Sequence, residues 1–483
     1  MPPRSGPRTN SFHEDTDQMT TKAIDPPGDM THAPTNKLYF AAWRWHFYAG
    51  LFVVPFLLIL AVTGMIMMIS TATSNQLGTV ADVAITGAPV PVTAQAEAAL
   101  AAVPGGILNQ YVAPEAPHRP AFFAIEQGHA VMSVAVDPYT GAVLNSQDKT
   151  TTLYAVANRI HGTLLIGETG DRIIETAASL IVLLIVTGLW MWLPKAGLRA
   201  VVPDLRARGR SLFKSLHTSV GTAISLFLLL FVLSGLSWTG IWGGQFVQPW
   251  SSFPAEKTWT GVPLSDRTHA SMNHAGHQDV AWGMEQVPMP ASGSEAGTAG
   301  VSGGVTLDTV SAWAGRNGFS GQYRISVPQD ESGVFTVMAE VRNEDGVMPW
   351  ADRTTHLDRL TGNVLADVRY ADYAPMAKAM AWGIGLHKGL VGPLNFAFNL
   401  LFLLLVIATC VTGVAMWWKR RPSGAVRLAA PPMPRDMPLW KGAVLVALAL
   451  AMAFPMAGVA LLAVVALDVL LLSKVPALKR LLN

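Results

Sequence analysis

The segments VTGLWMW (186–192) and VTGVAMW (411–417) each end a long apolar stretch of the chain. A helix needs about 20 apolar residues to cross the hydrocarbon core of a bilayer. Four stretches reach that length and two are shorter; in chain order they cover residues 47–69, 172–193, 218–241, 394–418, 440–456 and 457–473. The sequence therefore predicts an integral membrane α-helical bundle of four core helices with a C-terminal helical hairpin.

The composition agrees with a membrane protein. Hydrophobic residues make up 51% of the 483 residues and charged residues 14%, against roughly 25% charged in typical soluble domains. The net charge of +2 gives no reason to expect nucleic acid as a partner. The single cysteine, Cys410, excludes disulfides, Cys-based zinc sites, iron–sulfur clusters and covalently attached c-type haem. Any metal chemistry must come from the 12 histidines, the methionines or the carboxylates.

Matched motifs indicate an internal repeat. HFYAG (46–50) and HTSVG (217–221) open the first and third apolar stretches, and in each case a glycine, Gly64 or Gly235, follows the histidine by 18 residues. Further pairs recur in the same order: HGTLLIG (161–167) with HKGLVG (387–392), and VDPYTGAVL (136–144) with LDRLTGNVL (357–365). Each Asp-x-x-Thr-Gly turn before a β-branched run predicts a hairpin tip that enters a strand.

Basic residues set the expected orientation. They concentrate in 194–216, 419–438 and 474–483, which all lie on one side if six helices alternate. Since Lys and Arg favour the cytoplasmic side, both termini are expected in the cytoplasm and the two long segments in the periplasm of a bacterial inner-membrane protein.

The expected organisation follows from these stretches. It comprises a disordered cytoplasmic tail (1–36), helix one (38–69), the first external α+β domain (70–158), a His-containing segment with helix two (159–193), a basic cytoplasmic loop (194–216), helix three (217–241), the second external α+β domain (242–384) with a His/Met-rich loop (265–300), a His-containing segment with helix four (385–418), a cytoplasmic loop (419–438), the terminal hairpin (439–473) and a cytoplasmic tail (474–483).

The motifs, taken in order, resemble the PepSY-associated transmembrane helix family over roughly residues 38–420. The resemblance implies two periplasmic PepSY-like domains. It also implies kinship with iron-regulated inner-membrane proteins and siderophore-iron reductases that carry b-type haem. Some members have a fused flavodoxin- and NADPH-binding region. This chain has no Gly-rich nucleotide motif after a strand, so the expected electron donor is quinol or a separate cytoplasmic reductase.

Four histidines occupy repeat-equivalent places at the ends of the predicted helices: His46, His161, His217 and His387. Neutral imidazole is the usual axial ligand of b-type haem. With one histidine per helix, depth predicts that His46 pairs with His217 near the cytoplasm and that His161 pairs with His387 near the periplasm, giving two haems. The alternative to haem ligation, for each of the four histidines, is a side chain at the membrane interface that bonds to a backbone carbonyl.

Small and basic residues flank these histidines. Gly50, Gly162 and Gly221 could admit a flat macrocycle or could be ordinary helix contacts. The nearby basic residues Arg44, Arg159, Lys214 and Lys388 are positioned to pair with haem propionates, or to snorkel to the membrane interface.

The second external segment contains DRTHASMNHAGHQDVAWGMEQVPMP, in which His269, Met272, His274 and His277 are candidate ligands for copper, iron or zinc. The spacing fits no regular site, so a flexible loop is the expected structure, and an adjustable lid is a second interpretation.

The leading hypothesis is an inner-membrane haem-dependent ferric-siderophore reductase. It passes electrons across the membrane to a periplasmic acceptor and releases ferrous iron. The expected partners are membrane lipid, the ferric siderophore or another periplasmic acceptor, and the donor. The alternative is a non-catalytic regulatory membrane protein whose external domains bind a peptide, a protease or a metal.

Overall fold

The computed structural model describes residues 37–74, 81–250, 261–273, 280–339, 342–343, 346–421, 428–431 and 441–467, together with 470 and 475. The expected N-terminal tail, 1–36, lies outside the described residues.

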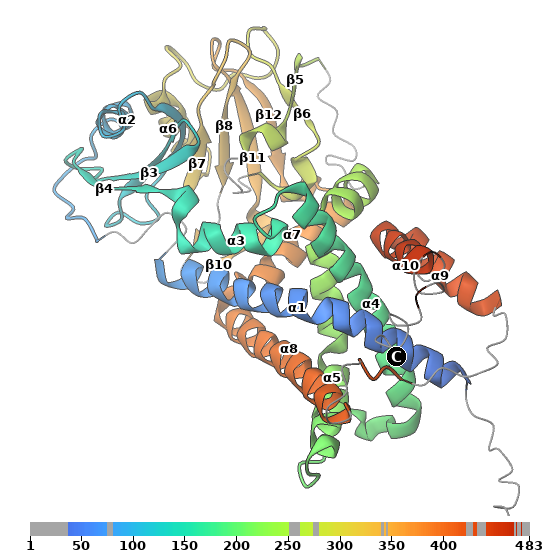
Figure 1. Ribbon diagram of the computed structural model, residues 1–483. Helices are drawn as coiled ribbons and strands as arrows, with labels where there is room; N and C mark the ends of the chain where they lie inside the picture. The colour runs from blue at the N-terminus through green and yellow to red at the C-terminus, as the bar shows by residue number, and fades with distance from the viewer. Residues whose placement is uncertain are drawn as a thin grey trace, which may run out of the picture.

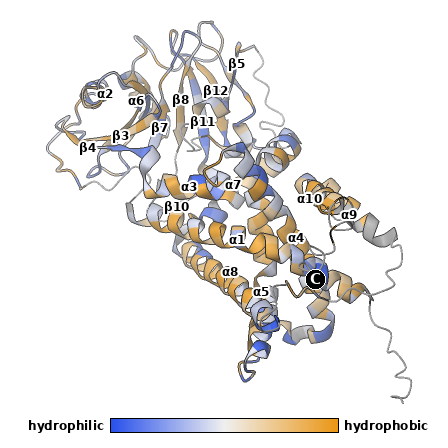
Figure 2. Ribbon diagram, viewed as in Figure 1, coloured by the Kyte–Doolittle hydropathy of each residue, from blue (hydrophilic) through white to orange (hydrophobic). Residues whose placement is uncertain are grey.

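Four long apolar helices form the membrane bundle (Figure 1): α1 (Lys37–Ser74), α4 (Glu168–Ala196), α5 (Arg210–Leu236) and α8 (Gly392–Arg420). At 1.5 Å per residue the shortest is about 40 Å long, which exceeds a hydrocarbon core of roughly 30 Å. Figure 2 shows that these helices consist largely of hydrophobic residues, as expected where lipid surrounds a helix. Within the described residues, four helices are long and apolar enough to cross a membrane, which makes this an integral membrane protein.

Two shorter helices, α9 (Lys441–Ala453) and α10 (Pro455–Leu467), lie beside the bundle (Figure 1). The chain turns at Phe454, whose ring stacks on Trp242 with 6.0 Å between ring centroids. The Trp242 indole N–H also donates to the Ala453 carbonyl at 2.9 Å. Each helix is about 20 Å long, shorter than the hydrocarbon core.

A single eight-stranded antiparallel sheet stands over one end of the bundle (Figure 1). Its strands, in spatial order, are β12 (Val364–Arg369), β11 (Arg353–Asp358), β8 (Val334–Ala339), β7 (Tyr323–Ser326), β1 (Ile107–Val112), β2 (Ala121–Gln127), β3 (Ala130–Val136) and β4 (Val143–Asp148). The two predicted external domains therefore share one sheet, joined where β1 pairs with β7 and Tyr111 lies opposite Ile325. β9 (Arg342–Asn343) and β10 (Gly346–Val347) form a separate two-stranded sheet.

One face of the sheet is covered by α2 (Val92–Ala101) and α6 (Leu307–Arg316). Phe123, Ile125 and Ile325 point into this core and are fully buried. Because alternate residues of a strand face opposite sides, the core takes its side chains from every second position of both halves, so the two halves are expected to fold as one unit.

The two Asp-x-x-Thr-Gly motifs form the β3–β4 and β11–β12 turns, as predicted. Asp137 accepts a hydrogen bond from the backbone N–H of Tyr139, and Asp358 does the same for Leu360. Gly141 and Gly362, the glycines of the two motifs, adopt φ of 71° and 73°, a left-handed conformation that favours glycine.

Two helices lie between the sheet and the long helices (Figure 1): α3 (Leu153–Thr163) and α7 (Pro375–Lys388). Each ends in a left-handed residue, Leu164 with φ 50° and Gly389 with φ 72°. The chain then turns sharply, from α3 into α4 and from α7 into α8. His161 of α3 thereby lies close to α1, and His387 of α7 lies close to α5.

The His/Met-rich segment differs from the expected flexible loop. Its described part contains a short hairpin of β5 (Leu264–Thr268) and β6 (Pro288–Pro290). Met284 is fully buried, and Met272 and Trp282 are nearly so. Burial of these apolar side chains is the reason that the segment folds onto the sheet domain.

Candidate functional site

Each of the four repeat-equivalent histidines lies against a glycine of another helix. His46 of α1 contacts Gly188 of α4, and His161 of α3 contacts Gly64 of α1. In the second half, His217 of α5 contacts Gly413 of α8, and His387 of α7 contacts Gly235 of α5. All four rings are half-buried. Glycine at these positions lets an imidazole ring approach the helix backbone closely.

A hydrogen-bond acceptor holds the Nδ1 atom of every one of these rings. The hydroxyl of the residue before the glycine serves three of them, with Thr187 at 3.0 Å from His46, Thr63 at 2.9 Å from His161 and Ser234 at 2.8 Å from His387. The fourth ring, that of His217, bonds to the Thr409 carbonyl at 2.9 Å.

These bonds favour one tautomer of the four rings. The hydroxyls of Thr187, Thr63 and Ser234 also lie within hydrogen-bond distance of a carbonyl of their own helix, at 2.6, 2.7 and 3.0 Å. A hydroxyl that donates its single hydrogen to that carbonyl accepts a hydrogen bond from the histidine, and the Thr409 carbonyl can only accept. We infer that Nδ1 carries the hydrogen, which leaves the lone pair of Nε2 able to bind a metal.

The histidines pair across the two halves of the bundle. The ring centroids of His46 and His217 are 6.3 Å apart, with the ring planes at 89°. If two imidazole rings bind one metal ion from opposite sides, each metal–nitrogen bond is about 2.0–2.1 Å long. With the distance from each ring centre to its Nε2 added, the two ring centroids are then about 6 Å apart. This spacing fits one metal ion between the two rings. His161 and His387 also come from different halves; the ring of His387 packs against that of Phe231, with 4.8 Å between ring centroids.

The two pairs lie at opposite ends of the bundle. His46 and Gly64 are 18 residues apart on α1, as are His217 and Gly235 on α5, which corresponds to about 27 Å along each helix. We call His46 with His217 the inner pair and His161 with His387 the outer pair. The outer pair is nearer the sheet, because α3 and α7 lie between the sheet and the long helices (Figure 1).

The other glycines singled out from the sequence do not contact the histidines. A Cβ at Gly50 would meet Leu184, and one at Gly221 would meet Thr409, both at ordinary contact distance. A Cβ at Gly162 would meet nothing within 4 Å. Gly50 and Gly221 thus lie at helix–helix contacts, and the approach of a macrocycle to them stays a prediction.

The predicted propionate partners have different surroundings. Arg44 donates to the Pro431 carbonyl at 2.7 Å and lies 5.1 Å from the centre of the Tyr48 ring. Lys388 lies 5.2 Å from the centre of the Trp238 ring. Arg159 and Lys214 are exposed to the surroundings of the protein. Contact of these four residues with a propionate stays a prediction.

The candidate metal ligands of the His/Met-rich segment do not gather in the described structure. His274 and His277 lie outside the described residues. His269 is fully buried and uses both ring nitrogens, bonding to the Val287 carbonyl at 2.6 Å and to Nε2 of His356 at 3.0 Å. Met272 packs in an apolar cluster. Within the described residues, no group of three or more His, Cys, Asp or Glu side chains could hold a metal ion.

Burial determines the ionisation of this region of the sheet domain. It lowers the pKa of His269 to about 4 and that of His356 well below the usual value, since a charged imidazole would lose its hydration. Burial also raises the pKa of the nearby Asp352 carboxyl to about 7.

Several residues that support the histidines were not identified from the sequence. The hydroxyls of Thr63, Thr187 and Ser234 could have been noticed, because Ser or Thr precedes each of the histidine-contacting glycines. Buried Asn399 of α8 donates to the carbonyls of Leu386 and His387, at 2.7 and 3.1 Å, and so holds the end of α7. No local pattern predicts that contact.

The fold and site together define an integral membrane protein with paired histidines in its helices and an antiparallel sheet domain at one end. The family described as PepSY-associated TM region matches residues 43–420, and the chain belongs to that family, as predicted from its motifs. No curated protein matches the sequence.

Proposed function

We propose that this protein is an inner-membrane di-haem b oxidoreductase that passes electrons to a periplasmic acceptor, ferric iron held by a siderophore. The observation that carries the proposal is the set of four histidines whose Nδ1 atoms are all hydrogen-bonded to the protein. Nδ1 bonds of this kind fix the tautomer and orientation of metal-ligating histidines.

The residues present fit haem b. Imidazole is its usual axial ligand, the inner rings have a spacing suited to one metal ion, and the single cysteine, Cys410, is buried within α8. Bound haem would supply a one-electron couple at each level of the bundle. His46 and His217 would hold the inner group, and His161 and His387 the outer one.

The protein's own residues prepare these positions before anything binds. The hydroxyls of Thr63, Thr187 and Ser234 and the Thr409 carbonyl bond to Nδ1 and so favour the tautomer in which Nε2 is unprotonated. Each ligand pair takes one histidine from either half of the bundle, in keeping with the two-copy repeat proposed from the sequence. The sheet domain, which stands over the outer pair, would shape the binding mouth.

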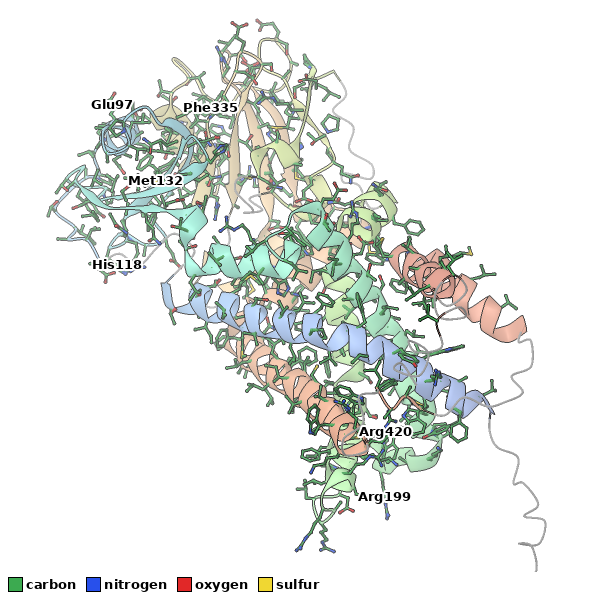
Figure 3. All side chains as sticks on the ribbon, viewed as in Figure 1. Glu97, His118, Met132, Arg199, Phe335 and Arg420 are labelled. Atoms are coloured by element: carbon green, nitrogen blue, oxygen red, sulfur yellow. The ribbon has the colours of Figure 1, made fainter. Side chains whose placement is uncertain are left out.

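The orientation proposed from the sequence places the sheet in the periplasm and both termini in the cytoplasm. Figure 3 supports it, because Arg199 and Arg420 lie at the end of the bundle away from the sheet. Other described basic residues, Lys195, Arg210, Lys214 and Lys419, belong to the same helix ends. Lys and Arg favour the cytoplasmic side.

The proposed reaction is a one-electron reduction of each ferric ion. The electron comes from quinol or from a separate cytoplasmic reductase, and the product is ferrous iron. Reduction releases the metal because hard oxygen donors bind Fe(II) less tightly than Fe(III). The chain would thus act without forming or breaking a covalent bond in the siderophore.

An optical spectrum of the purified protein tests the proposal. We expect a reduced-minus-oxidised spectrum of low-spin haem b, and oxidation of the reduced protein by a ferric hydroxamate with formation of Fe(II). A colourless protein contradicts haem binding. A coloured protein that ferric chelates do not oxidise contradicts the proposed acceptor while leaving haem binding intact.

A further inference from the structure

A charged cluster lies at the start of α4, where the helix enters the bundle. It comprises Glu168, Asp171, Arg172 and Glu175. Glu175 has no exposed surface, and the side chain of Asp171 is 19% exposed. A carboxylate buried in a membrane helix is costly unless it is paired or hydrogen-bonded, so the partners of these two groups indicate what they do.

Both carboxylates bind the backbone of a segment distant in sequence. Asp171 accepts from the N–H of Gly240 at 3.0 Å. Glu175 accepts from the N–H groups of Ile241 and Trp242, at 3.2 and 3.0 Å. These three N–H groups begin the π-helix Gly240–Val247, where the helix itself supplies no acceptor.

Arg172 balances the charge of this contact. Its guanidinium lies 2.7 Å from an Asp171 oxygen and 3.6 Å from a Glu175 oxygen. It also pairs with Glu168 at 2.9 Å, but the Glu168 side chain is 80% exposed. The buried part of the cluster is therefore the Asp171 and Glu175 contact with residues 240–242.

This contact joins the supports of the two outer histidines. On one side, α4 begins directly after α3, which carries His161, and Gly170 packs tightly against the Thr163 carbonyl at the end of α3. On the other side, residues 240–242 follow the end of α5, where Ser234 and Gly235 hold His387. The inner pair is remote, since Gly188 lies about 20 Å further along α4 from Glu175.

We propose that Asp171 and Glu175 are positioning residues that set the spacing and relative orientation of His161 and His387. The inference rests on the proposed function, in which these histidines hold the outer haem. Neither carboxylate touches the histidines. They act by fixing the α3–α4 corner against the end of α5, so that the two rings from different halves of the bundle are held at a constant separation.

The test compares the two haems within one sample. Glu175→Gln, Glu175→Ala and Asp171→Asn are purified beside the wild type, and Glu168→Gln is the matched control because it removes a charge from the same arginine at an exposed position. The EPR signals of the oxidised protein and a redox titration are the readouts. His46→Ala and His161→Ala variants assign each signal to the inner or the outer haem.

We expect the outer signal and its midpoint potential to shift, more in Glu175→Ala than in Glu175→Gln, while the inner signal coincides with the wild type and Glu168→Gln changes neither. The inference is overturned if the outer signal does not shift, or if both signals change alike, since that result indicates general destabilisation. If Glu175→Ala does not fold, Asp171→Asn decides by the same criterion. Absence of haem from the wild type would instead refute the proposed function.

Discussion

The glycines under the four histidines differ in how much space they leave, which makes a matched set of alanine substitutions informative. A Cβ at Gly188 would lie 3.1 Å from Cε1 of His46, and one at Gly413 would lie 3.1 Å from Cε1 of His217. The corresponding distances at Gly64 and Gly235, under the outer histidines, are both 3.7 Å.

Carbon atoms pack best at about 3.5–4.0 Å, so Gly188→Ala and Gly413→Ala must push the inner rings away by roughly 0.5 Å. Overpacking of this kind costs about 1–3 kcal/mol, which lowers haem affinity at the inner pair by roughly 5- to 150-fold. Gly64→Ala and Gly235→Ala fit without displacement. Because alanine is favoured over glycine in a helix by up to about 1 kcal/mol, they should be neutral or slightly stabilising.

Haem content per chain and the midpoint potential of each haem measure the effect, after reconstitution of apoprotein with limiting haem. Gly50→Ala is the control, since that glycine of α1 faces Leu184 rather than a histidine. Equal losses at all four glycines, or a larger loss at Gly64 and Gly235 than at Gly188 and Gly413, would refute the reasoning.

Three further predictions concern the outer pair and the sheet domain. Asn399→Leu removes two hydrogen bonds that hold the end of α7 beside His387, each worth about 1 kcal/mol net. On heating, the variant should then release the outer haem before the inner one. Absorbance follows the release, and simultaneous loss of both haems would contradict this prediction. Burial raises the pKa of Asp352 to about 7, so the folded chain keeps a proton that the unfolded chain loses above about pH 4. The contribution of Asp352 to the free energy of unfolding should fall as the pH rises from about 4 to 7, and Asp352→Asn should abolish that contribution in denaturant titrations. Burial lowers the pKa of His269 to about 4, so the contribution of His269 has the opposite sign and falls as the pH drops from about 6.5 to 4. His269→Phe should remove that acid-dependent loss while weakening the protein at pH 7, because it removes the bond to His356; a difference between variant and wild type that does not change with pH would count against the argument.

The long helices could be predicted because each is a continuous apolar run, but their ends could not. Helix α5 begins at Arg210, before the apolar stretch at 218, since a helix continues past the hydrocarbon region where basic side chains reach water. It ends at Leu236 although the predicted apolar stretch runs to residue 241, because Asp171 and Glu175 take the N–H groups of residues 240–242. A contact across about 65 residues of sequence leaves no local pattern.

The positions of the site histidines were predictable, and their environment was not. Repeat equivalence singled out His46, His161, His217 and His387, and depth predicted that His46 pairs with His217; in the structure the centroids of these two rings are 6.3 Å apart. The hydroxyl or carbonyl that holds each ring is on a different helix from its histidine, so only packing reveals its role. The pairing of His269 with His356 was missed for the same reason, because the two residues come from segments 87 apart in sequence.

The family assignment and the paired histidines make haem content the central quantity. Pyridine haemochrome analysis of the purified protein, carried out on the wild type and on the His46→Ala and His161→Ala variants, measures it directly. The account predicts two haem b groups in the wild type, with each variant losing one and keeping the other. Wild-type protein without haem b, or variants that retain the full content, would contradict it.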